Sequence, residues 1–253
     1  MGTADEMKYY STYAQKFSPD IVILCFFMGS DITDNSYYYK YKDALLSPKD
    51  AWDAVPQYGV EQGKNFVALK DRIYRVSAIL RFVDRVVRSS PALNGLAIKA
   101  GLYRTPIKSD YGLNIPFWTY YYLDPLDQEL AQNLKFTSDL LNNLQKQLTV
   151  DKVKFGMMII PEGMTTNKTW IDAFEKDHPK LKDYRFDPIG TETKLVAGLD
   201  PTIKVLNLRE PVTKQVLVGD KVYMVPGGEG HFSEIGNTIV TDALFPFVVS
   251  LLK

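Results

Sequence analysis

The chain has 253 residues, 30 of them Lys or Arg and 30 of them Asp or Glu, so its formal net charge is zero. This length can bury a sizeable hydrophobic core, and without a basic excess there is no reason to expect a nucleic-acid partner. The longest purely apolar run, residues 21–28, is far shorter than the roughly 20 residues that a membrane span needs, so no membrane span is expected.

The first predicted elements are a helix and a buried strand. Apolar residues at three- and four-residue spacing predict a helix over residues 4–17, which Ser18, Pro19 and Asp20 end. The continuous run Ile21–Phe27 has the β-branched and aromatic composition of a strand with helices on both faces. Within it, Cys25 is the only cysteine, which excludes an internal disulfide, and we expect a buried, unreactive thiol.

Residues 36–118 do not follow the alternation of strands and helices, and we interpret them as a tyrosine-rich insertion or cap. One strong helical pattern, residues 71–88, carries arginines along one side, which could grip anionic groups or form a solvated face. The aromatic clusters could line a sugar or acyl pocket, or they could pack the cap onto the sheet. These tyrosines are Tyr37, Tyr38, Tyr39, Tyr41, Tyr111, Tyr120, Tyr121 and Tyr122.

The second half of the chain continues with strands separated by helices. A long amphipathic helix is predicted over residues 125–148, and strand-like runs follow at Lys154–Ile160 and at residues 203–208. Helical patterns occupy residues 169–176 and 192–199. This alternation predicts an α/β fold with a parallel sheet.

The C-terminal part is predicted to contain a small hairpin and a closing helix. Residues 216–224 are typical of a hairpin that turns at Gly219. An apolar face at helical spacing predicts a helix over residues 233–252, with Ser233 as its N-cap. Pro246 is expected to kink this helix or to split off its last turn.

Two segments far apart in the sequence are predicted to meet at the carboxyl ends of the strands, where open parallel sheets bind ligands. Gly29 and Ser30 follow the strand Ile21–Phe27, and His231 lies in a Gly-rich turn just before the closing helix. A base on one loop and hydrogen-bond donors for an oxyanion on another are what acyl-transfer chemistry requires.

No metal or nucleotide cofactor is expected. The two histidines, His178 and His231, are distant in sequence, and the scattered carboxylates lack metal-ligand spacing. No Gly-rich phosphate-binding loop follows a predicted strand.

Three segments resemble sequence blocks of the SGNH/GDSL hydrolases. Residues 19–31 look like the third block, which normally reads Gly-x-Asn-Asp, and residues 230–237 look like the fifth, in which Asp-x-x-His precedes the last helix. Residues 2–6, Gly-Thr-Ala-Asp-Glu, are similar to the start of the helix after the second block. The resemblance implies a three-layer, flavodoxin-like α/β/α fold with a parallel sheet, in which residues 1–253 form a single domain with residues 36–118 inserted, and metal-free ester hydrolysis.

The resemblance also implies roles for particular residues. In the family, a serine of the first block attacks the ester carbonyl and the last-block histidine takes its proton, so His231 is the implied general base. Gly29 and Ser30 are implied to hold the oxyanion. The orienting carboxylate stands three residues before the histidine in the family, where this chain has Gly228. Glu229 beside it could take that role or be a solvated loop carboxylate.

The chain departs from the family pattern most strongly at the first block. No Gly-Asp-Ser-Leu-like segment is present, and the family's first strands are expected to be missing from these residues. One of them would lie beside Ile21–Phe27, so that edge is expected to be covered by an upstream segment or by another chain. Ser30 replaces the third-block Asn and has a shorter reach as a donor. Ser30 could also be a nucleophile after a strand, but the Gly-x-Ser-x-Gly pattern is absent.

Two functions fit these residues. The first is an SGNH/GDSL-type serine ester hydrolase, an esterase or acetylhydrolase acting on a small ester or an acetylated glycan, which lacks its nucleophile block here and is expected to be inactive alone. The second is a non-catalytic relative that binds a glycan or a protein partner. The altered Asn and Asp positions and the aromatic insertion favour the second function.

Overall fold

The computed structural model of the chain describes residues 2–55, 117–219, 221–224 and 231–253, with isolated positions between 79 and 97. The chain divides into two compact units, one formed by Met1–Asp53 with Ser109–Lys253 and the other by Ala54–Lys108. Nearly all of the second unit lies outside the described residues, including most of the helix predicted over residues 71–88. The proposed insertion over residues 36–118 therefore stays a prediction.

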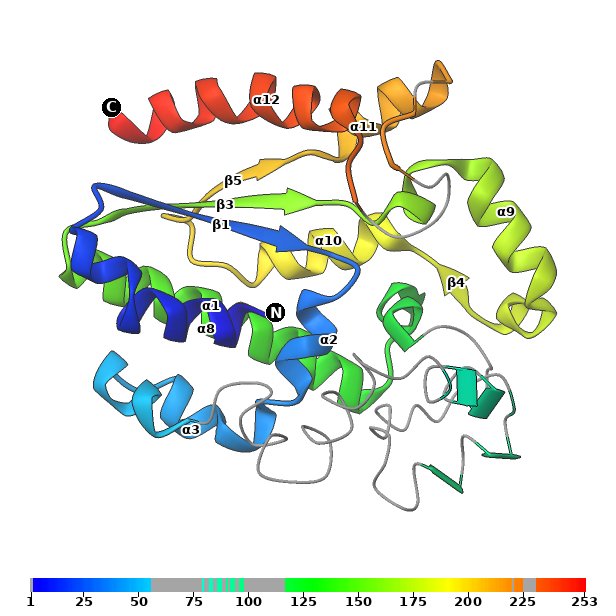
Figure 1. The fold of residues 1–253 in the computed structure, drawn as a ribbon, viewed down its shortest axis with the longest axis horizontal. Helices are drawn as coiled ribbons and strands as arrows, with labels where there is room; N and C mark the ends of the chain where they lie inside the picture. Colours follow the sequence, from blue (N-terminus) through cyan, green and yellow to red (C-terminus); the bar gives the residue numbers. More distant parts are fainter. Residues whose placement is uncertain are drawn as a thin grey trace. The chain divides into compact units, whose positions relative to one another are not determined.

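A three-stranded parallel sheet forms the centre of the first unit. Its strands are β1 (Ile21–Phe27), β3 (Lys154–Ile160) and β5 (Lys204–Asn207), in the order β1-β3-β5. Figure 1 shows the three strands running in the same direction. The first two strands have the bounds predicted from sequence, and the third is one residue shorter at each end, so the structure is an α/β fold.

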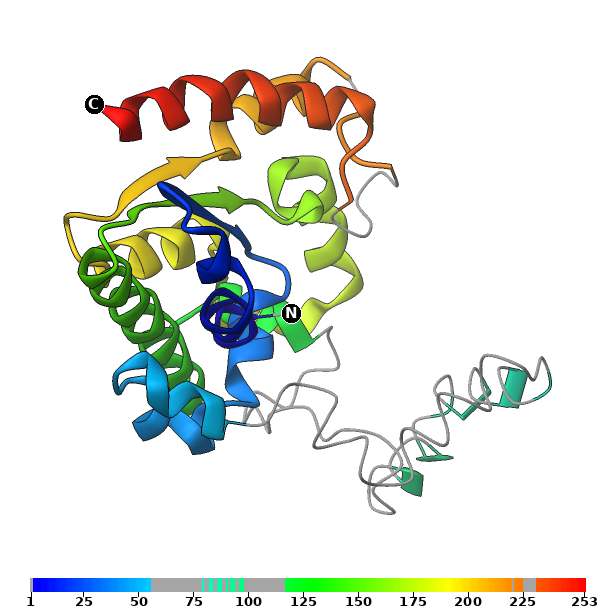
Figure 2. The same ribbon diagram turned by 60° about the vertical axis from the view of Figure 1, so that its left-hand side comes forward.

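Helices cover both faces of this sheet. On one face lie α1 (Thr3–Thr12), α8 (Gln128–Val150) and α10 (Pro188–Ala197), and on the other lie α11 (Arg209–Leu217) and α12 (Glu234–Leu252) (Figures 1 and 2). The remaining elements in the described part of this unit, apart from short 3-10 turns, are α2 (Asp31–Ser36), α3 (Lys42–Leu45), α9 (Lys168–Asp177), and the two strands of a separate antiparallel sheet, β2 (Leu123–Asp124) and β4 (Arg185–Phe186).

Side-chain caps explain where several of these helices begin. A capping oxygen accepts a hydrogen bond from one of the first backbone N–H groups, which would otherwise have no partner in the helix. Ser233, the predicted N-cap, accepts from the N–H of Gly236 at 3.2 Å and starts α12. The other capping residues are Asp127 for α8, Asn167 for α9 and Asp187 for α10.

The two faces of β1 differ in burial. Leu24 and Phe26 are buried, whereas Ile23 and Cys25 alternate to the opposite face. The register places Cys25 beside Met158, on the side that α12 covers. The expectation of a buried thiol is wrong, because Cys25 is exposed. Since β1 pairs only with β3 among the described residues and α12 contacts β3 and β5, the outer strand stays open on this side.

The prediction of a hairpin over residues 216–224 is also wrong. Val216 lies in α11, which ends at Leu217, and Gly219 turns the chain with a φ of +92°. Val212 and Val216, four residues apart, are both buried on the inner side of the helix. The predicted turn at Gly219 is confirmed, but the packing of this helical face overrides the strand-like local sequence.

The closing helix is continuous, whereas the first helix is interrupted. α12 passes through Pro246 to Leu252, so its last turn is not split off. Phe247 and Leu251 pack against Gly156 of β3, which has no side chain to displace them, and these contacts hold the turn after the proline. The helix predicted over residues 4–17 ends at Thr12 and continues as a 3-10 turn, η1 (Ala14–Phe17).

α12 is the one helix in the described part of the chain that is long and apolar enough to cross a membrane, judged by length and composition alone. Only 11% of its most apolar window is buried in the structure. Its outward side chains include Phe245 and Leu252, which are 72% and 57% exposed. The expectation of no membrane span is therefore neither confirmed nor contradicted.

Candidate functional site

The turn after β1 is fixed by Asp31, the first residue of α2. Its Oδ2 accepts a hydrogen bond from the backbone N–H of Phe27 at 2.9 Å, and its Oδ1 accepts one from the Ser30 hydroxyl at 3.2 Å. Asp31 is only 3% exposed, and burial raises its pKa to about 7 although the bond from Phe27 favours the charged form. This carboxyl group therefore holds the turn that contains Gly29 and Ser30.

The same contacts engage both donors of Ser30. Its hydroxyl donates to Asp31, and its backbone N–H donates to the carbonyl oxygen of Phe27 at 3.3 Å. A hydroxyl has one hydrogen to donate. For Ser30 to stabilise an oxyanion through its side chain, the hydroxyl must rotate away from Asp31.

Gly29 lies directly against a carboxylate that the sequence analysis missed. A Cβ atom at Gly29 would lie 2.3 Å from Oε2 of Glu162 and 2.6 Å from the ring of Phe27, so any other residue here would have to displace these side chains. Glu162 follows the second strand of the sheet after Pro161, and it is 5% exposed. Its place just beyond a strand's carboxyl end was the one sequence signal that could have identified it.

Burial sets the electrostatics of Glu162. Loss of solvent raises the pKa of this carboxyl group to about 7, although the backbone N–H groups of Met164 and Gly163 donate to it. Within the described residues, Glu162 forms no ion pair with Lys or Arg. Near neutral pH this end of the sheet therefore contains a carboxyl group that is partly protonated.

Two buried tyrosines tie the ends of the strands to neighbouring segments. The hydroxyl of Tyr122 donates to the carbonyl oxygen of Met28 at 3.1 Å, and that of Tyr223 donates to the carbonyl of Pro161 at 3.0 Å. Tyr122 ends the 3-10 turn η4 (Phe117–Tyr122), and Tyr223 pairs with Phe232 in an antiparallel bridge. Both tyrosines are buried and pack the interior here.

His231 lies at the same end of the sheet as the turn after β1. Its carbonyl oxygen accepts from the N–H of Met224 at 2.9 Å, and Ser233 N–H donates to Val222 at 2.9 Å, so the segment entering α12 is joined to residues 222–224. Figures 1 and 2 show the chain running from the start of α12 towards the carboxyl end of β3. The two predicted segments therefore share one rim.

The side chain of His231 is exposed and takes part in no hydrogen bond with the described residues. Gly228 and Glu229 lie outside the described residues, so the orienting role suggested for Glu229 stays a prediction. The second histidine has a local structural role, because Nδ1 of His178 lies 2.8 Å from the carbonyl oxygen of Phe174 in the last turn of α9.

A buried ion pair lies at the same end of the sheet. Arg209, the first residue of α11, contacts Glu192 of α10, with side chains only 12% and 3% exposed. Arg209 also donates to the carbonyl oxygen of Thr165 at 2.8 Å, and Asn207 donates to Glu192 at 3.1 Å. These contacts satisfy the pair internally and join α10, β5 and α11.

A groove of about 290 Å³ runs along the unpaired edge of β1, between the strand and α1. In its wall, Oε2 of Glu6 is buried and has no hydrogen-bond partner in the described part of the chain. Burial, and then the nearby carboxyl of Asp31, raise the pKa of Glu6 to about 8. The other lining residues are Tyr9, Tyr10, Ala14, Val22, Ile23, Leu24 and Leu144.

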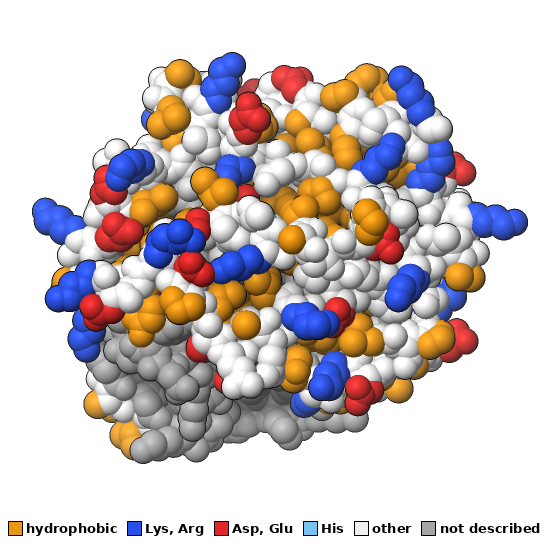
Figure 3. Space-filling view, turned by 180° about the vertical axis from the view of Figure 1, so that it is seen from behind, with side chains coloured by type: hydrophobic (Ala, Val, Ile, Leu, Met, Phe, Trp, Pro, Cys, Tyr) orange, Lys and Arg blue, Asp and Glu red, His pale blue; other side chains and the backbone are white. Residues whose placement is uncertain are grey.

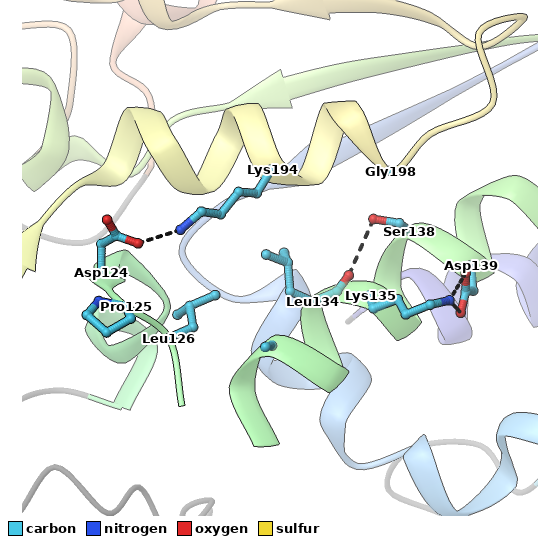
Figure 4. A pocket seen from close by; sticks show the side chains of 10 residues that line it. Asp124, Pro125, Leu126, Leu134, Lys135, Ser138, Asp139, Lys194 and Gly198 are labelled. Carbon is cyan, nitrogen blue, oxygen red and sulfur yellow. Dashed lines mark hydrogen bonds and ion pairs between the residues drawn. The ribbon is translucent and has the colours of Figure 1, made fainter. Parts of the chain in front are cut away.

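A larger hollow of about 470 Å³ lies between α8, α10 and the segment around Asp124 (Figure 4). Its two lysines are each held by a carboxylate, Lys194 by Asp124 at 2.7 Å and Lys135 by Asp139 at 2.7 Å. The hollow contains none of the residues at the rim and carries no further argument about function.

The described residues contain no group of three His, Cys, Asp or Glu side chains placed to hold a metal ion. On the face seen in Figure 3, basic and acidic side chains are interspersed with apolar ones, as the zero net charge leads one to expect. No protein-family model matches the chain, and neither the curated proteins nor the solved structures contain a match.

Proposed function

We propose that the carboxyl end of the sheet is the site of an SGNH/GDSL-type serine ester hydrolase, built on the three-layer, flavodoxin-like arrangement of that family. The observation that carries the proposal is that the Gly29–Ser30 turn and the His231 segment, distant in sequence, lie at one rim of a parallel sheet. His231 is the general base, Gly29 and Ser30 form part of the oxyanion rim, and Glu229 is the candidate for orienting the histidine.

The attacking hydroxyl is supplied by a segment that pairs with the open edge of β1. That edge is apolar, it pairs with no other strand in the described residues, and a groove containing the unpartnered Glu6 runs beside it. Long apolar edges are normally covered, because their backbone N–H and C=O groups are unsatisfied. The covering strand comes from an upstream segment of the protein or from another chain, and it carries the serine to the rim.

In this mechanism His231 takes the proton of the serine hydroxyl as the oxygen attacks the ester carbonyl. The tetrahedral oxyanion is held by the backbone N–H of Gly29 and by the Ser30 hydroxyl, once that hydroxyl has rotated away from Asp31. Collapse of the intermediate releases the alcohol, which receives its proton from His231. A water molecule, activated by the same imidazole, then hydrolyses the acyl-enzyme.

The substrate class is a small ester or an acetylated glycan, and the test compares two preparations. We expect no turnover of p-nitrophenyl acetate by the 253-residue chain alone, and turnover by the chain preceded by the residues encoded in frame upstream. His231→Ala should abolish that turnover, whereas the control His178→Ala should not. His231-dependent turnover by the chain alone would show that the nucleophile lies within these residues.

A second function is favoured by the hydrogen bond from Ser30 to Asp31, which removes the side-chain donor from the rim. In this alternative the chain is a non-catalytic relative that binds a glycan or a partner. Binding of acetylated polysaccharide that survives His231→Ala, in an extended chain without turnover, would favour this alternative over the enzyme.

A further inference from the structure

The carboxyl group of Glu162 and the backbone of Gly29 are in direct contact. The 2.3 Å separation between Oε2 and a Cβ built on Gly29 means that the carboxyl group rests on the Cα atom of the glycine. The ring of Phe27 lies 2.6 Å from the same built Cβ atom and closes the other side of this space. A change in the position or hydration of this carboxyl group must therefore be transmitted to the Gly29–Ser30 turn.

The surroundings of Glu162 favour an uncharged carboxyl group. The side chain is 5% exposed, and its donors are two backbone N–H groups of its own loop. The basic side chain of the buried ion pair at this end of the sheet, Arg209, is committed to Glu192 and Thr165. A buried carboxylate without a counter-ion is expensive, so burial works against ionisation here.

Other titratable groups face this end of the sheet and must be separated from Glu162 in any test. Asp31 is the most important, because it binds the same turn through Ser30 and Phe27 and has its own raised pKa. Glu6 of α1 interacts electrostatically with Asp31. The remaining groups are Tyr122 from η4, Glu192 from α10, Arg209 from α11 and Tyr223 from the segment before His231.

We infer that Glu162 is a positioning residue for the Gly29–Ser30 turn and that it holds this turn through the contact between its carboxyl group and the backbone of Gly29. A neutral carboxyl group beside Gly29 is compatible with an anionic oxygen at the rim, whereas a carboxylate there would repel it. The link to turnover rests on the proposed ester hydrolase. The contact between Glu162 and the turn is independent of that proposal, and it can be tested in the 253-residue chain without an activity assay.

The test is a pH titration of the 253-residue chain followed by NMR, with no substrate present. The side-chain carboxyl carbon of Glu162 and the Cα and Hα signals of Gly29 should titrate together, with a midpoint near pH 7. Glu162→Gln should remove that titration from Gly29, while Asp31→Asn should leave it in place. Glu175→Gln on the exposed surface of α9 is the matched control and should change nothing.

Two results would overturn the inference. A midpoint below pH 5 for Glu162 in the unsubstituted chain would show that the carboxyl group is charged near neutrality. Persistence of the Gly29 titration in Glu162→Gln would show that another group moves the turn. The first result needs no variant, so it decides the question even if Glu162→Gln fails to fold.

The activity arm uses the extended chain. Turnover limited by ionisation of Glu162 should fall by up to about tenfold for each pH unit above the midpoint. Glu162→Gln should abolish this alkaline decline. An unchanged decline in this variant, with the NMR result as expected, would contradict the link to catalysis while leaving the positioning role intact.

Discussion

The hydroxyl of Tyr223 donates a hydrogen bond to the carbonyl oxygen of Pro161 at 3.0 Å, and this bond joins the His231 segment to the end of β3. Tyr223 is 2% exposed and pairs with Phe232, the residue after His231. Pro161 precedes Glu162, whose carboxyl group lies against Gly29. One chain of contacts therefore connects the imidazole-bearing segment, the second strand and the turn after the first.

Tyr223→Phe should test this connection. The substitution keeps the ring and leaves the Pro161 carbonyl oxygen without its partner, which should lower the free energy of unfolding by about 1–3 kcal/mol. Urea denaturation measures this change. Tyr9→Phe, at a side chain that is 56% exposed, is the control and should stay within about 0.5 kcal/mol of the unsubstituted chain. Equal effects of the two substitutions would contradict the structural role of the Tyr223 hydroxyl.

Gly29→Ala should be strongly destabilising. Its Cβ atom would lie 2.3 Å from Glu162 and 2.6 Å from the ring of Phe27, and overpacking of this kind costs about 1–3 kcal/mol. Urea denaturation of Gly29→Ala and of the double variant with Glu162→Ala should show non-additive losses, because the second substitution removes one of the clashing groups. Purely additive losses would mean that the two residues are not in contact.

The sequence predicts those parts of the fold and site that local residues specify, and it does not predict those that depend on contacts between remote residues. β1 and β3 were predicted with their observed bounds, because continuous apolar runs between turn residues specify buried strands locally. The environments of Cys25 and Glu162 could not be predicted. Exposure of Cys25 depends on which strand lies beside β1, and the role of Glu162 depends on contact with Gly29, which is remote in the sequence.

The stability of the chain should fall as the pH rises from about 4 to about 8. Burial raises the pKa of Glu6 from 4.5 to about 8, that of Asp31 from 3.8 to about 7 and that of Glu162 from 4.5 to about 7. Between the unfolded and folded pKa values the folded state binds more protons, so raising the pH favours unfolding, and the dependence ends above the folded values.

Thermal unfolding between pH 4.5 and 9 measures this dependence. The melting temperature should be highest at mildly acidic pH, and Glu162→Gln should flatten part of the decline, whereas Glu175→Gln should not. A melting temperature that rises steadily from pH 5 to pH 8 would show that these carboxyl groups are not buried as described.

The rate at which the Cys25 thiol is alkylated should show whether another strand covers the edge of β1. Its side chain is exposed, but partial burial of the sulfur and the nearby carboxyl groups of Glu6 and Asp31 raise the thiol pKa. Labelling with iodoacetamide should therefore be slow at pH 7 and faster at pH 9. The extended chain should be protected, since the added strand covers the edge, and Cys25→Ser controls for reaction elsewhere. Equal labelling of both preparations would argue against a covering strand.

The most direct test of the shared site is a paramagnetic label at position 231. His231→Cys in a Cys25→Ser background, carrying a nitroxide label, should broaden the amide signals of Gly29 and Ser30. The signal of Val150, at the end of α8 just before β3 begins, should stay sharp. Sharp signals at Gly29 and Ser30, with broadening at Val150, would place the label at the opposite end of the sheet and contradict the proposed site.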